Sequence, residues 1–343
     1  MRVGSMANTS RPATIVDVAR VAGVSRQTVS RAMNGLPDIS AETRERVIEA
    51  ARTLKYRPNR AAQGLVRGRE TTIGFVVEDL QNPYYPELAS ALSRIAGERG
   101  WTVMLCDVGQ SMESASAQLT SLVRRVDALV ITGCQGGSVG AIPVSTFKQS
   151  IVGIPTVILD GSSEDAFDAY VSIDHRAGVV RALDHLVGRG RRHIAMIDTL
   201  QMDSLRRDSY RDYLVRHDLA WTEDSEVRVE ETLAGGITAA TTLMERYPQM
   251  DAILAYNDIL AIGALKGLGR SGVQVPESIS VMGIDGLAVG AMVTPELTTL
   301  AIDKTELARH AIELLDDIVS SSAVSGAGAS RTLQYELTLR GSS

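Results

Sequence analysis

Residues 14–31 read TIVDVARVAGVSRQTVSR, and this stretch decides the fold of the N-terminal region. Gly23 separates two segments with helical periodicity, and Ser25 can cap the second helix, which we expect to run to about Met33. The first segment carries an apolar face at helical spacing, formed by Ile15, Val18, Ala19 and Ala22. Two short helices joined at a glycine predict a helix-turn-helix.

A third helix completes this small domain. Residues 34–38, NGLPD, are a turn by composition, and Ser40 can cap the helix that follows. The inner face of this helix consists of Thr43, Val47, Ala51 and Leu54. Pro58 interrupts the pattern, so we expect an all-α head over residues 14–58, preceded by a disordered extension of residues 1–13.

The second helix carries side chains that can read DNA. In a helix-turn-helix, the N-terminal residues of this helix meet base edges in the major groove, where Arg pairs with guanine and Gln with adenine. Arg26, Gln27 and Arg31 share one side of the helix. Hydroxyl groups nearby suit backbone phosphates, which set the register without reading the sequence: Thr14, Ser25, Thr28, Ser30 and Ser40. The alternative is a small solvated bundle whose polar face has no function.

Charge is divided unevenly along the chain. The net charge of the 343 residues is −6, which by itself argues weakly against nucleic-acid binding. Residues 1–70 carry 13 Lys and Arg against 6 Asp and Glu, whereas the rest of the chain carries 22 against 35. A basic head on an acidic body concentrates the attraction for phosphate at one end of the protein.

Length and composition indicate a globular protein of two or three domains. No apolar run is long enough to span a membrane, and the polar N-terminus lacks the apolar core of a secretory signal, so we expect a cytoplasmic protein. Cys106 and Cys134 end apolar runs without ligand spacing, which is typical of reduced thiols in or near a core. The five histidines show no metal spacing either, and we expect no cofactor, no metal and no catalytic residue.

From residue 72 onward, strand-like runs alternate with helical stretches. The expected strands are 72–77, 102–106, 128–132, 156–159, 169–173, 193–197, 252–255 and 280–284. The expected helices are 85–99, 114–125, 177–188, 205–217 and 259–269. This rhythm predicts an α/β body of parallel sheets flanked by helices, long enough for two lobes. Ligands of such sheets bind beyond the carboxyl ends of the strands, so polar residues at strand ends are binding candidates.

Several ordered segments resemble the lactose-repressor (LacI/GalR) family of transcription regulators. In the head they are TIVDVA (14–19), AGVSRQTVSR (22–31), TRERV (43–47) and YRPNRAA (56–62). In the body they are NPYY (82–85), ND (257–258), GID (283–285) and PELTT (295–299). The resemblance covers essentially the whole chain. It implies a helix-turn-helix head, a two-lobed α/β body like that of periplasmic binding proteins, and a small-molecule effector bound between the lobes.

The resemblance assigns roles at the DNA. Residues 59–67, within a linker of residues 59–70, would form a hinge helix that folds when two subunits meet on the operator. Leu65 would wedge into the minor groove beside Ala62, an unstacking that the contacts of bent DNA offset. The full set expected to contact DNA is Thr14, Ser25, Arg26, Gln27, Thr28, Ser30, Arg31, Asn34, Ser40, Asn59, Arg60, Ala62 and Leu65.

Two residues of the head depart from this pattern. Gly64 weakens the hinge helix by up to about 1 kcal/mol relative to Ala, so its folding should depend more on DNA and on the partner subunit. Asp38 places an acid where a DNA-facing side chain is expected.

The resemblance also divides the body, residues 71–343, into two lobes. The N-lobe would comprise about 71–171 and 303–328, and the C-lobe about 172–302 and 329–340, with three crossings between them. Asp285 and Arg206 match the acid and the arginine that bind the effector, with Arg207 as the alternative if the register is shifted by one residue. The full set of pocket candidates is Asp79, Asn82, Tyr84, Tyr85, Asp160, Arg206, Asn257 and Asp285.

Simpler interpretations exist for some of these residues and their neighbours. Asp174 and Asp258 suit helix N-caps, and Asn82-Pro83 suits a turn. Gly286 replaces the polar residue that often follows the aspartate, and Glu230–Thr232 offers no aromatic where many relatives stack one on a sugar. We therefore expect an effector other than a plain hexose.

The resulting prediction is a repressor that binds a roughly palindromic operator as a homodimer and is controlled by a sugar or related metabolite. Only RGSS follows Leu339, without the leucine heptads that would join dimers into a tetramer. Two alternatives are a solute-binding protein of a transporter, against which the basic head counts, and an α/β enzyme. For the enzyme we find no G-x-S-x-G motif, phosphate-binding loop or metal cluster.

Overall fold

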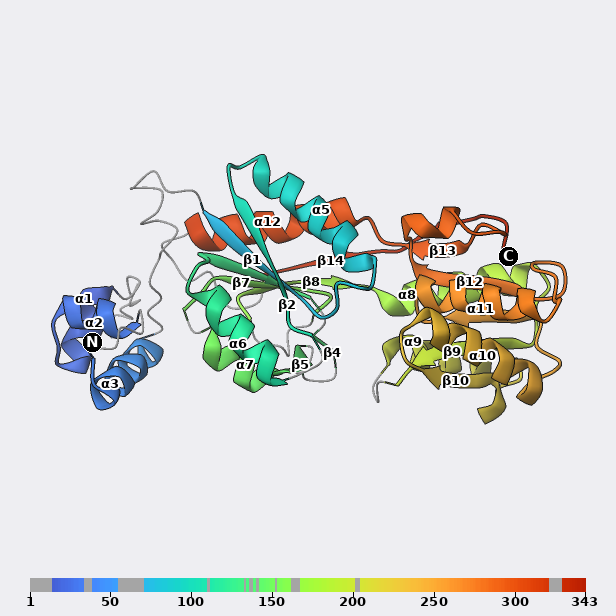
Figure 1. Ribbon diagram of the computed structural model, residues 1–343, viewed down its shortest axis with the longest axis horizontal. Helices are drawn as coiled ribbons and strands as arrows, with labels where there is room; N and C mark the ends of the chain where they lie inside the picture. The colour runs from blue at the N-terminus through green and yellow to red at the C-terminus, as the bar shows by residue number, and fades with distance from the viewer. Residues whose placement is uncertain are drawn as a thin grey trace, which may run out of the picture.

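The computed structural model shows a small helical head and a two-lobed α/β body (Figure 1). The structure describes residues 14–33, 39–54, 71–109, 112–132, 134–135, 138–139, 142–151, 153–161, 167–200, 204–320 and 329–343. Several predicted features lie outside these residues: the extension 1–13, Asn34, Asp38, the hinge and linker 59–70, and with them Asn59, Arg60, Ala62, Gly64 and Leu65. Within the described residues, no helix is long and apolar enough to cross a membrane.

Three helices form the head: α1 (Ile15–Ala22), α2 (Arg26–Met33) and α3 (Ala41–Thr53). Gly23 ends α1 with a left-handed φ of 66°, a conformation that glycine adopts without steric cost. The head core consists of Val18, Ala19, Ala22, Val29, Ala32, Val47, Ala50 and Ala51. The apolar faces predicted from helical spacing therefore meet in one small core.

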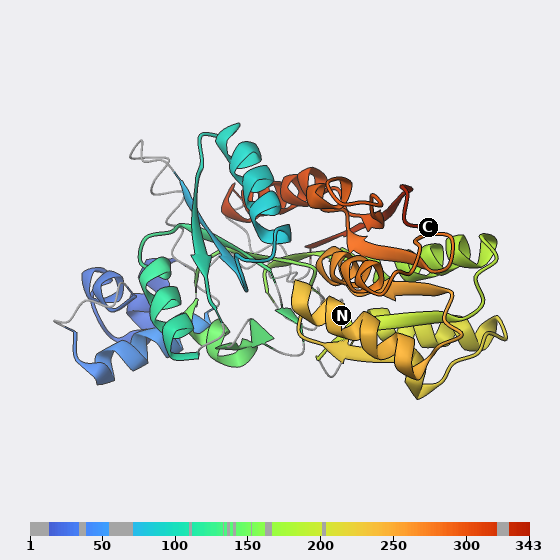
Figure 2. The ribbon, with the colours of Figure 1, turned by 45° about the vertical axis from the view of Figure 1, so that its right-hand side comes forward.

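The N-lobe is a six-stranded parallel sheet with helices on both faces. Its strands, in the order β14-β8-β7-β3-β1-β2, are β14 (Ala329–Leu333), β8 (Ala169–Ile173), β7 (Thr156–Leu159), β3 (Ala128–Ile131), β1 (Thr72–Val77) and β2 (Thr102–Asp107). One face is covered by α5 (Tyr84–Gly97) and α12 (Lys304–Ser320), and the other by α6 (Met112–Val123) and α7 (Val144–Ser150), as Figures 1 and 2 show. A small antiparallel sheet adjoins α7 and consists of β4 (Cys134–Gln135), β5 (Ser138–Val139) and β6 (Ile142–Pro143).

The C-lobe repeats this architecture. Its strands, in the order β10-β9-β11-β12-β13-β15, are β10 (Glu226–Val229), β9 (Ile194–Thr199), β11 (Ala252–Ala255), β12 (Ser280–Asp285), β13 (Thr298–Ala301) and the antiparallel β15 (Glu336–Thr338). One face packs against α8 (His175–Gly188) and α9 (Leu205–Arg216), the other against α10 (Leu233–Arg246) and α11 (Asp258–Arg270). Two short 3-10 turns complete the lobe, η2 (Glu223–Ser225) and η3 (Ala288–Ala291).

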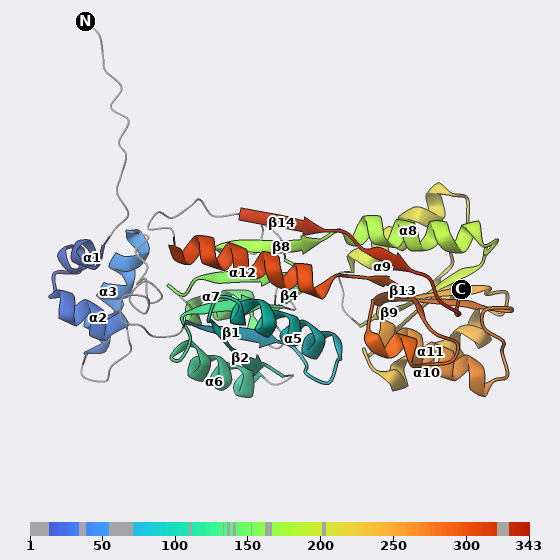
Figure 3. The ribbon, with the colours of Figure 1, turned by 90° about the horizontal axis from the view of Figure 1, so that it is seen from above.

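The chain crosses between the lobes three times, after β8, after β13 and after β14. Figure 3 shows β14 along the edge of the N-lobe sheet, where it pairs with β8 in parallel register from Ala329 to Leu333. The predicted assignment of residues 329–340 wholly to the C-lobe is therefore wrong. The last crossing lies between β14 and β15, because hydrogen bonding to β8 holds residues 329–333 in the N-lobe sheet.

Several elements were not among those expected from the sequence pattern, including α7, α12, β13, β14, β15, β10 and α10. The last two show why. β10 lies at a sheet edge and alternates charged with apolar residues over only four positions. α10 contains Gly235 and Gly236, which lower helix propensity. Packing explains both, because a Cβ on Gly236 would lie 2.3 Å from the carbonyl oxygen of Leu260 in α11, and one on Gly235 would lie 2.2 Å from that of Glu230. Glycine thus allows the close backbone contact, and it weakens the helical pattern in the sequence of α10.

Candidate functional site

The first candidate site is the outer surface of α2. The side chains of Ser25, Arg26, Gln27 and Arg31 are exposed there, whereas Val29 is buried in the head core. Ser25 caps the helix, because its Oγ accepts a hydrogen bond from the backbone N–H of Thr28 at 3.0 Å. The buried valine orients the helix, and the two arginines and the glutamine lie at its surface.

Other predicted phosphate ligands have structural partners within the head. The Thr14 hydroxyl donates to Asp17 at 2.7 Å, and Ser40 Oγ accepts from the backbone N–H of Thr43 at 3.3 Å. Both residues therefore stabilise helix N-termini. Thr28 is half-buried and Ser30 is exposed, so these hydroxyl residues also lie on or near the surface of α2.

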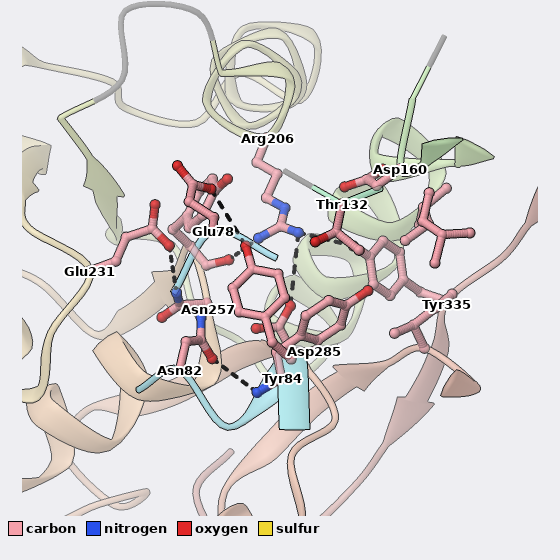
Figure 4. Close-up of a pocket in the computed structure, with 15 residues that line it drawn as sticks. Glu78, Asn82, Tyr84, Thr132, Asp160, Arg206, Glu231, Asn257, Asp285 and Tyr335 are labelled. Carbon is pink, nitrogen blue, oxygen red and sulfur yellow. Dashed lines mark hydrogen bonds and ion pairs between the residues drawn. The ribbon is translucent and has the colours of Figure 1, made fainter. Parts of the chain in front are cut away.

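The second candidate site is a cavity between the two lobes. Its polar and aromatic walls come from both lobes and from the crossings, as Figure 4 shows: Glu78, Asn82, Tyr84, Tyr85, Thr132, Asp160, Arg206, Glu231, Tyr256, Asn257, Asp285 and Tyr335. Leu159, Ile173 and Ile302 complete the lining. The volume of the cavity is about 60 Å³, which is room for a few water molecules.

Arg206, on the first turn of α9, is the central cation of the cavity. Its Nη1 donates to the carbonyl oxygen of Tyr256, and the guanidinium lies over the Tyr256 ring with its carbon 4.3 Å from the ring centroid. Nη2 lies 3.2 Å from the Tyr335 hydroxyl and 3.9 Å from Asp285 Oδ1. This guanidinium is therefore held in one orientation before any ligand binds.

A hydrogen-bond chain continues from Arg206 to the N-lobe through His175. Arg206 Nε is only a donor, so His175 Nδ1, at 3.4 Å, must accept. The His175 proton then resides on Nε2, which donates to Asp160 Oδ1 at 2.8 Å. The Tyr335 hydroxyl accepts from Arg206 and lies 3.0 Å from the same Nδ1, whose single lone pair Arg206 Nε and the Tyr335 hydroxyl share. Asp160, at the end of β7, is thus linked to the C-lobe arginine through side chains at two crossings.

Asp285 and Asp160, at the ends of β12 and β7, both have positive φ angles, 119° and 55°. Such strained conformations of non-glycine residues cluster at ligand sites. Burial raises the pKa of Asp285, and the nearby Asp160 adds to the rise, while Arg206 and Lys304 oppose it. The residue after Asp285 has to be glycine, since a Cβ on Gly286 would lie 2.5 Å from that of Ala301. The absence of a polar side chain at position 286 therefore has a steric cause.

The neighbouring Asp258 is not the helix cap that its position suggested. Asn257 caps α11 instead, with its Oδ1 accepting from the backbone N–H of Leu260 at 2.9 Å. Asp258 is fully buried and accepts from the Thr299 hydroxyl and the Leu287 backbone, at 2.5 and 2.6 Å. Its pKa is raised by burial and by the charge of Asp285. Asp174 does cap a helix, since its carboxylate accepts from the N–H of Ala177 at 2.9 Å.

Two glutamates contribute further acidity. Glu78 follows β1 and accepts from the Tyr85 hydroxyl at 3.5 Å, while burial raises its pKa. Glu231 precedes the N-cap of α10 and accepts from Asn257 Nδ2 at 3.1 Å. The pKa of Glu231 is raised to about 7, mainly because the cavity wall displaces water from its carboxylate. The positive charge of Arg206 lowers this pKa, and the negative charges of Glu78 and Asp285 raise it. The Glu231 side chain nevertheless stays partly exposed at the rim.

Seven of the eight predicted pocket residues line the cavity: Asn82, Tyr84, Tyr85, Asp160, Arg206, Asn257 and Asp285. Asp79 does not line it, because its carboxylate closes the turn by accepting from the N–H of Gln81 at 2.8 Å. The preceding residue, Glu78, faces the cavity instead. Asn82 also forms a turn, with its Oδ1 accepting from the N–H of Tyr84. Arg207, the alternative to Arg206, pairs with the buried Asp198 at 2.7 Å and does not line the cavity.

Five further residues of the cavity lining were not expected from the sequence: Glu78, Thr132, Glu231, Tyr256 and Tyr335. Glu78 and Tyr256 directly follow the ends of β1 and β11, so the strand-end rule contained a signal for both. Thr132 follows β3 in the same way. Tyr335 lies on the third crossing, for which the sequence has no strand-end signal.

Comparison with known proteins identifies the family. The family model described as "Bacterial regulatory proteins, lacI family" matches residues 14–59, and "Periplasmic binding protein-like domain" matches residues 183–343. The ribose operon repressor of Halalkalibacterium halodurans is 30% identical over 299 residues, which cover 84% of this chain and 84% of that protein. The chain belongs to the LacI family. As a member of it, this protein is a DNA-binding transcription regulator, and the transporter and enzyme alternatives are not favoured.

Solved structures of the LacI family share this fold along the body and the head. A LacI-family regulator from Arthrobacter sp. FB24, in complex with lactose, has 29% identity and a TM-score of 0.72, covering 80% of this chain and 99% of that one. The lac repressor dimer bound to operator and the anti-inducer ONPF has 27% identity and a TM-score of 0.68, covering 97% and 99%. The LacI-family regulator described here therefore has the predicted combination of a helix-turn-helix head and a two-lobed body.

Proposed function

We propose that this LacI-family regulator binds a pseudo-palindromic operator as a homodimer and changes its affinity for that operator when a polyhydroxylated small molecule enters the interlobe cavity. The observation that carries the proposal is the pairing of fixed polar groups from both lobes across one cavity: Asp160 from the N-lobe faces Arg206 and Asp285 from the C-lobe. A carboxylate accepts two hydroxyl hydrogen bonds, and a guanidinium donates several.

The arrangement also suggests how the two sites communicate. A ligand that bonds to Asp160 and to Arg206 or Asp285 stabilises one relative orientation of the lobes, since the residues belong to different sheets. A ligand shifts such an equilibrium only by its difference in affinity for the two orientations, and the coupling between effector and DNA is typically about 1 to 3 kcal/mol. In a dimer, lobe rotation would change the spacing of the two heads, which must match half-sites about 34 to 36 Å apart.

The lac repressor was solved as a dimer on its operator, and the Arthrobacter regulator with lactose. These similarities support a dimer, an operator and a sugar-like effector for this chain. At about 10–15 Å³ per water-sized site the cavity holds only a few such sites, so a sugar-sized effector would need the lobes to open further. Because the target is DNA, we place the protein in the bacterial cytoplasm.

The test is selection of DNA sequences from a random duplex library by the purified protein, followed by titration of the selected duplex with and without a metabolite panel. We expect affinity for the selected sequence about 10³-fold or more above that for random duplex, with strong dependence on salt. We also expect at least one metabolite to change it, and sedimentation to show a dimer at micromolar concentration. No preference for any sequence, with or without metabolites, would refute the proposal.

A further inference from the structure

The charges that line the interlobe cavity do not balance. Four carboxylates line it, those of Asp160, Asp285, Glu78 and Glu231, beside one guanidinium, that of Arg206. Lys304 also approaches Asp285, with its Nζ 2.8 Å from the Asp285 carbonyl oxygen, but this ammonium group pairs with Glu87 at 3.1 Å. Arg206 lies 3.9 Å from Asp285 and is already engaged by Tyr256 and Tyr335. Asp285 is buried, Asp160 and Glu78 are half-buried and Glu231 lies at the exposed rim. Carboxylates withdrawn from water need a cation or several hydrogen-bond donors to remain charged. The cavity therefore offers a ligand more negative charge than its own arginine neutralises.

Two of the carboxylates approach each other from opposite lobes. Glu78 follows β1 of the N-lobe, and Glu231 lies between β10 and α10 of the C-lobe. Both residues line the same cavity, and the charge of Glu78 is among the causes that raise the pKa of Glu231. In Figure 4 both lie on the side of the cavity away from Asp160 and Tyr335. This side is thus separate from the hydrogen-bond chain through His175.

Aromatic rings enclose the same side of the cavity. The Tyr85 hydroxyl contacts Glu78, and the charge of Glu231 acts on both Tyr85 and Tyr256. The Tyr256 ring already carries one cation on its face, Arg206 at 4.3 Å. Carboxylates beside tyrosine rings are the groups that recognise an ammonium ion, through charge-assisted hydrogen bonds and through the ring quadrupole.

Glu231 is also held in position without being neutralised. Asn257 Oδ1 is occupied by its cap of α11, so the amide must present Nδ2 to the Glu231 carboxylate. This contact orients the carboxylate but adds no positive charge. Because the Glu231 side chain is partly exposed at the rim, an ammonium ion bound there keeps some of its water. The desolvation penalty for a cation is correspondingly smaller than in a closed core.

We propose that Glu78 and Glu231 form a subsite for a protonated amine, and that the effector of this regulator is a polyhydroxylated amine rather than a neutral sugar. The inference rests on the proposed function, because it concerns the ligand of the same cavity. The hydroxyl groups would bond to Asp160, Arg206 and Asp285, and the ammonium group would lie between the two glutamates. An ammonium group in that place joins the two lobes directly, so the same contact that selects the ligand also favours closure.

The test uses matched pairs that differ in the amine. Binding to the full-length protein is measured by calorimetry at pH 7.5 for 1-amino-1-deoxy-D-sorbitol against D-sorbitol, D-glucosamine against D-glucose, and D-galactosamine against D-galactose. N-acetyl-D-glucosamine keeps the nitrogen but not its charge. We expect at least one amine to bind about ten- to a hundredfold more tightly than its neutral partner, and the acetylated sugar to follow the neutral one.

Variants then locate the preference. Glu231→Gln and Glu78→Gln should each lower the ratio of amine to neutral affinity by about tenfold, because each removes one charge and keeps the side-chain shape. Glu230→Gln is the matched control, since Glu230 is exposed and does not line the cavity. The ratio is measured within each variant, so a loss of stability does not imitate the effect.

The inference is overturned if no amine exceeds its neutral partner, or if neither glutamine variant changes the ratio. If no amine is preferred, a neutral sugar that binds, and whose binding is lost in Asp285→Ala, would leave the proposed function standing while removing the amine subsite. A protein that prefers no DNA sequence would instead remove the proposed function itself.

Discussion

The head surface proposed to read DNA and the interlobe cavity are assembled in contrasting ways. The first comes from a single helix, with Arg26, Gln27 and Arg31 within six consecutive residues. The second collects its lining from positions between Glu78 and Tyr335, contributed by both sheets and by the crossings. A substitution in the head should therefore act on one contact, whereas a substitution in the cavity disturbs groups that the fold brings together from distant segments.

The largest expected effect concerns Arg207, at the start of α9. Arg207→Ala should lower the free energy of unfolding by about 3 to 5 kcal/mol, because it leaves the fully buried Asp198 without its ion pair. Urea unfolding measures this. Arg176→Ala, which removes an exposed pair with Asp212, is the control and should cost about 0 to 1 kcal/mol. An equal cost for both variants would contradict the assignment of Arg207 to the scaffold.

Asp285→Ala should remove the response to the effector, with a loss of about 3 kcal/mol or more in effector binding, because hydrogen bonds to a charged group contribute about 1.5 to 3 kcal/mol each. Operator binding without effector should remain, since the head does not include this residue. Effector titrations of the protein–operator complex test both statements. Asp79→Ala, two residues beyond β1 and outside the cavity, should retain the response. Survival of the response in Asp285→Ala would place the effector elsewhere.

Arg26→Ala should weaken operator binding by about 1 to 3 kcal/mol and relax the preference at one base position. The physical reason is the loss of one bidentate contact to a base edge. Binding to a set of single-base operator variants measures it. Arg20→Ala is the control, because Arg20 on α1 pairs with Asp17 at 2.7 Å. A loss that is uniform over all sequences would make Arg26 a phosphate contact.

The smallest expected effect is on the pH dependence of stability. Glu231 has a folded-state pKa raised to about 7 from 4.5, so the folded protein holds its proton more tightly than the unfolded chain. Its contribution to stability is therefore fully present below about pH 4.5 and is lost as the pH rises through 7. Glu231→Gln should lose less stability than the native protein between pH 5 and pH 8, measured as the melting temperature at each pH.

The control for this prediction is Glu230→Gln, which should follow the native protein across the same range. The groups that act on Glu231 are Arg206, Glu78, Asp285 and Asp198, and none of them is changed in either variant. Identical pH profiles for Glu231→Gln and the native protein would show that this carboxylate titrates as it does in the unfolded chain.

Local patterns predicted much of the molecule. The bounds of β1, β7 and β11 agree with the strands expected from apolar runs, since a strand buried on both faces is apolar throughout. β8 also has the expected bounds, although its buried residues alternate with half-buried ones. The buried face of α1 follows helical spacing for the same kind of reason. The candidates at strand ends, such as Asp160 and Asp285, reach the cavity because parallel strands end at the same edge.

Which of two adjacent polar residues lines the cavity or caps a helix was less predictable. Glu78 faces the cavity and Asp79 closes a turn, although both follow β1. Asn257 caps α11 and Asp258 is buried, although both residue types suit a cap. Neighbouring polar residues point in different directions, and which of them meets a partner depends on packing that sequence spacing does not contain.

The sequence by itself determined the helix-turn-helix, the alternation of strands and helices, and the family, because each depends on patterns within short stretches or on ordered motifs. Only the tertiary structure decided that β14 joins the N-lobe sheet, that Tyr335 and His175 link Arg206 to Asp160, and that Glu78 and Glu231 line one cavity. These contacts join residues from about 15 to 160 positions apart. They form when sheets and crossings close into two lobes, and no local periodicity encodes that closure.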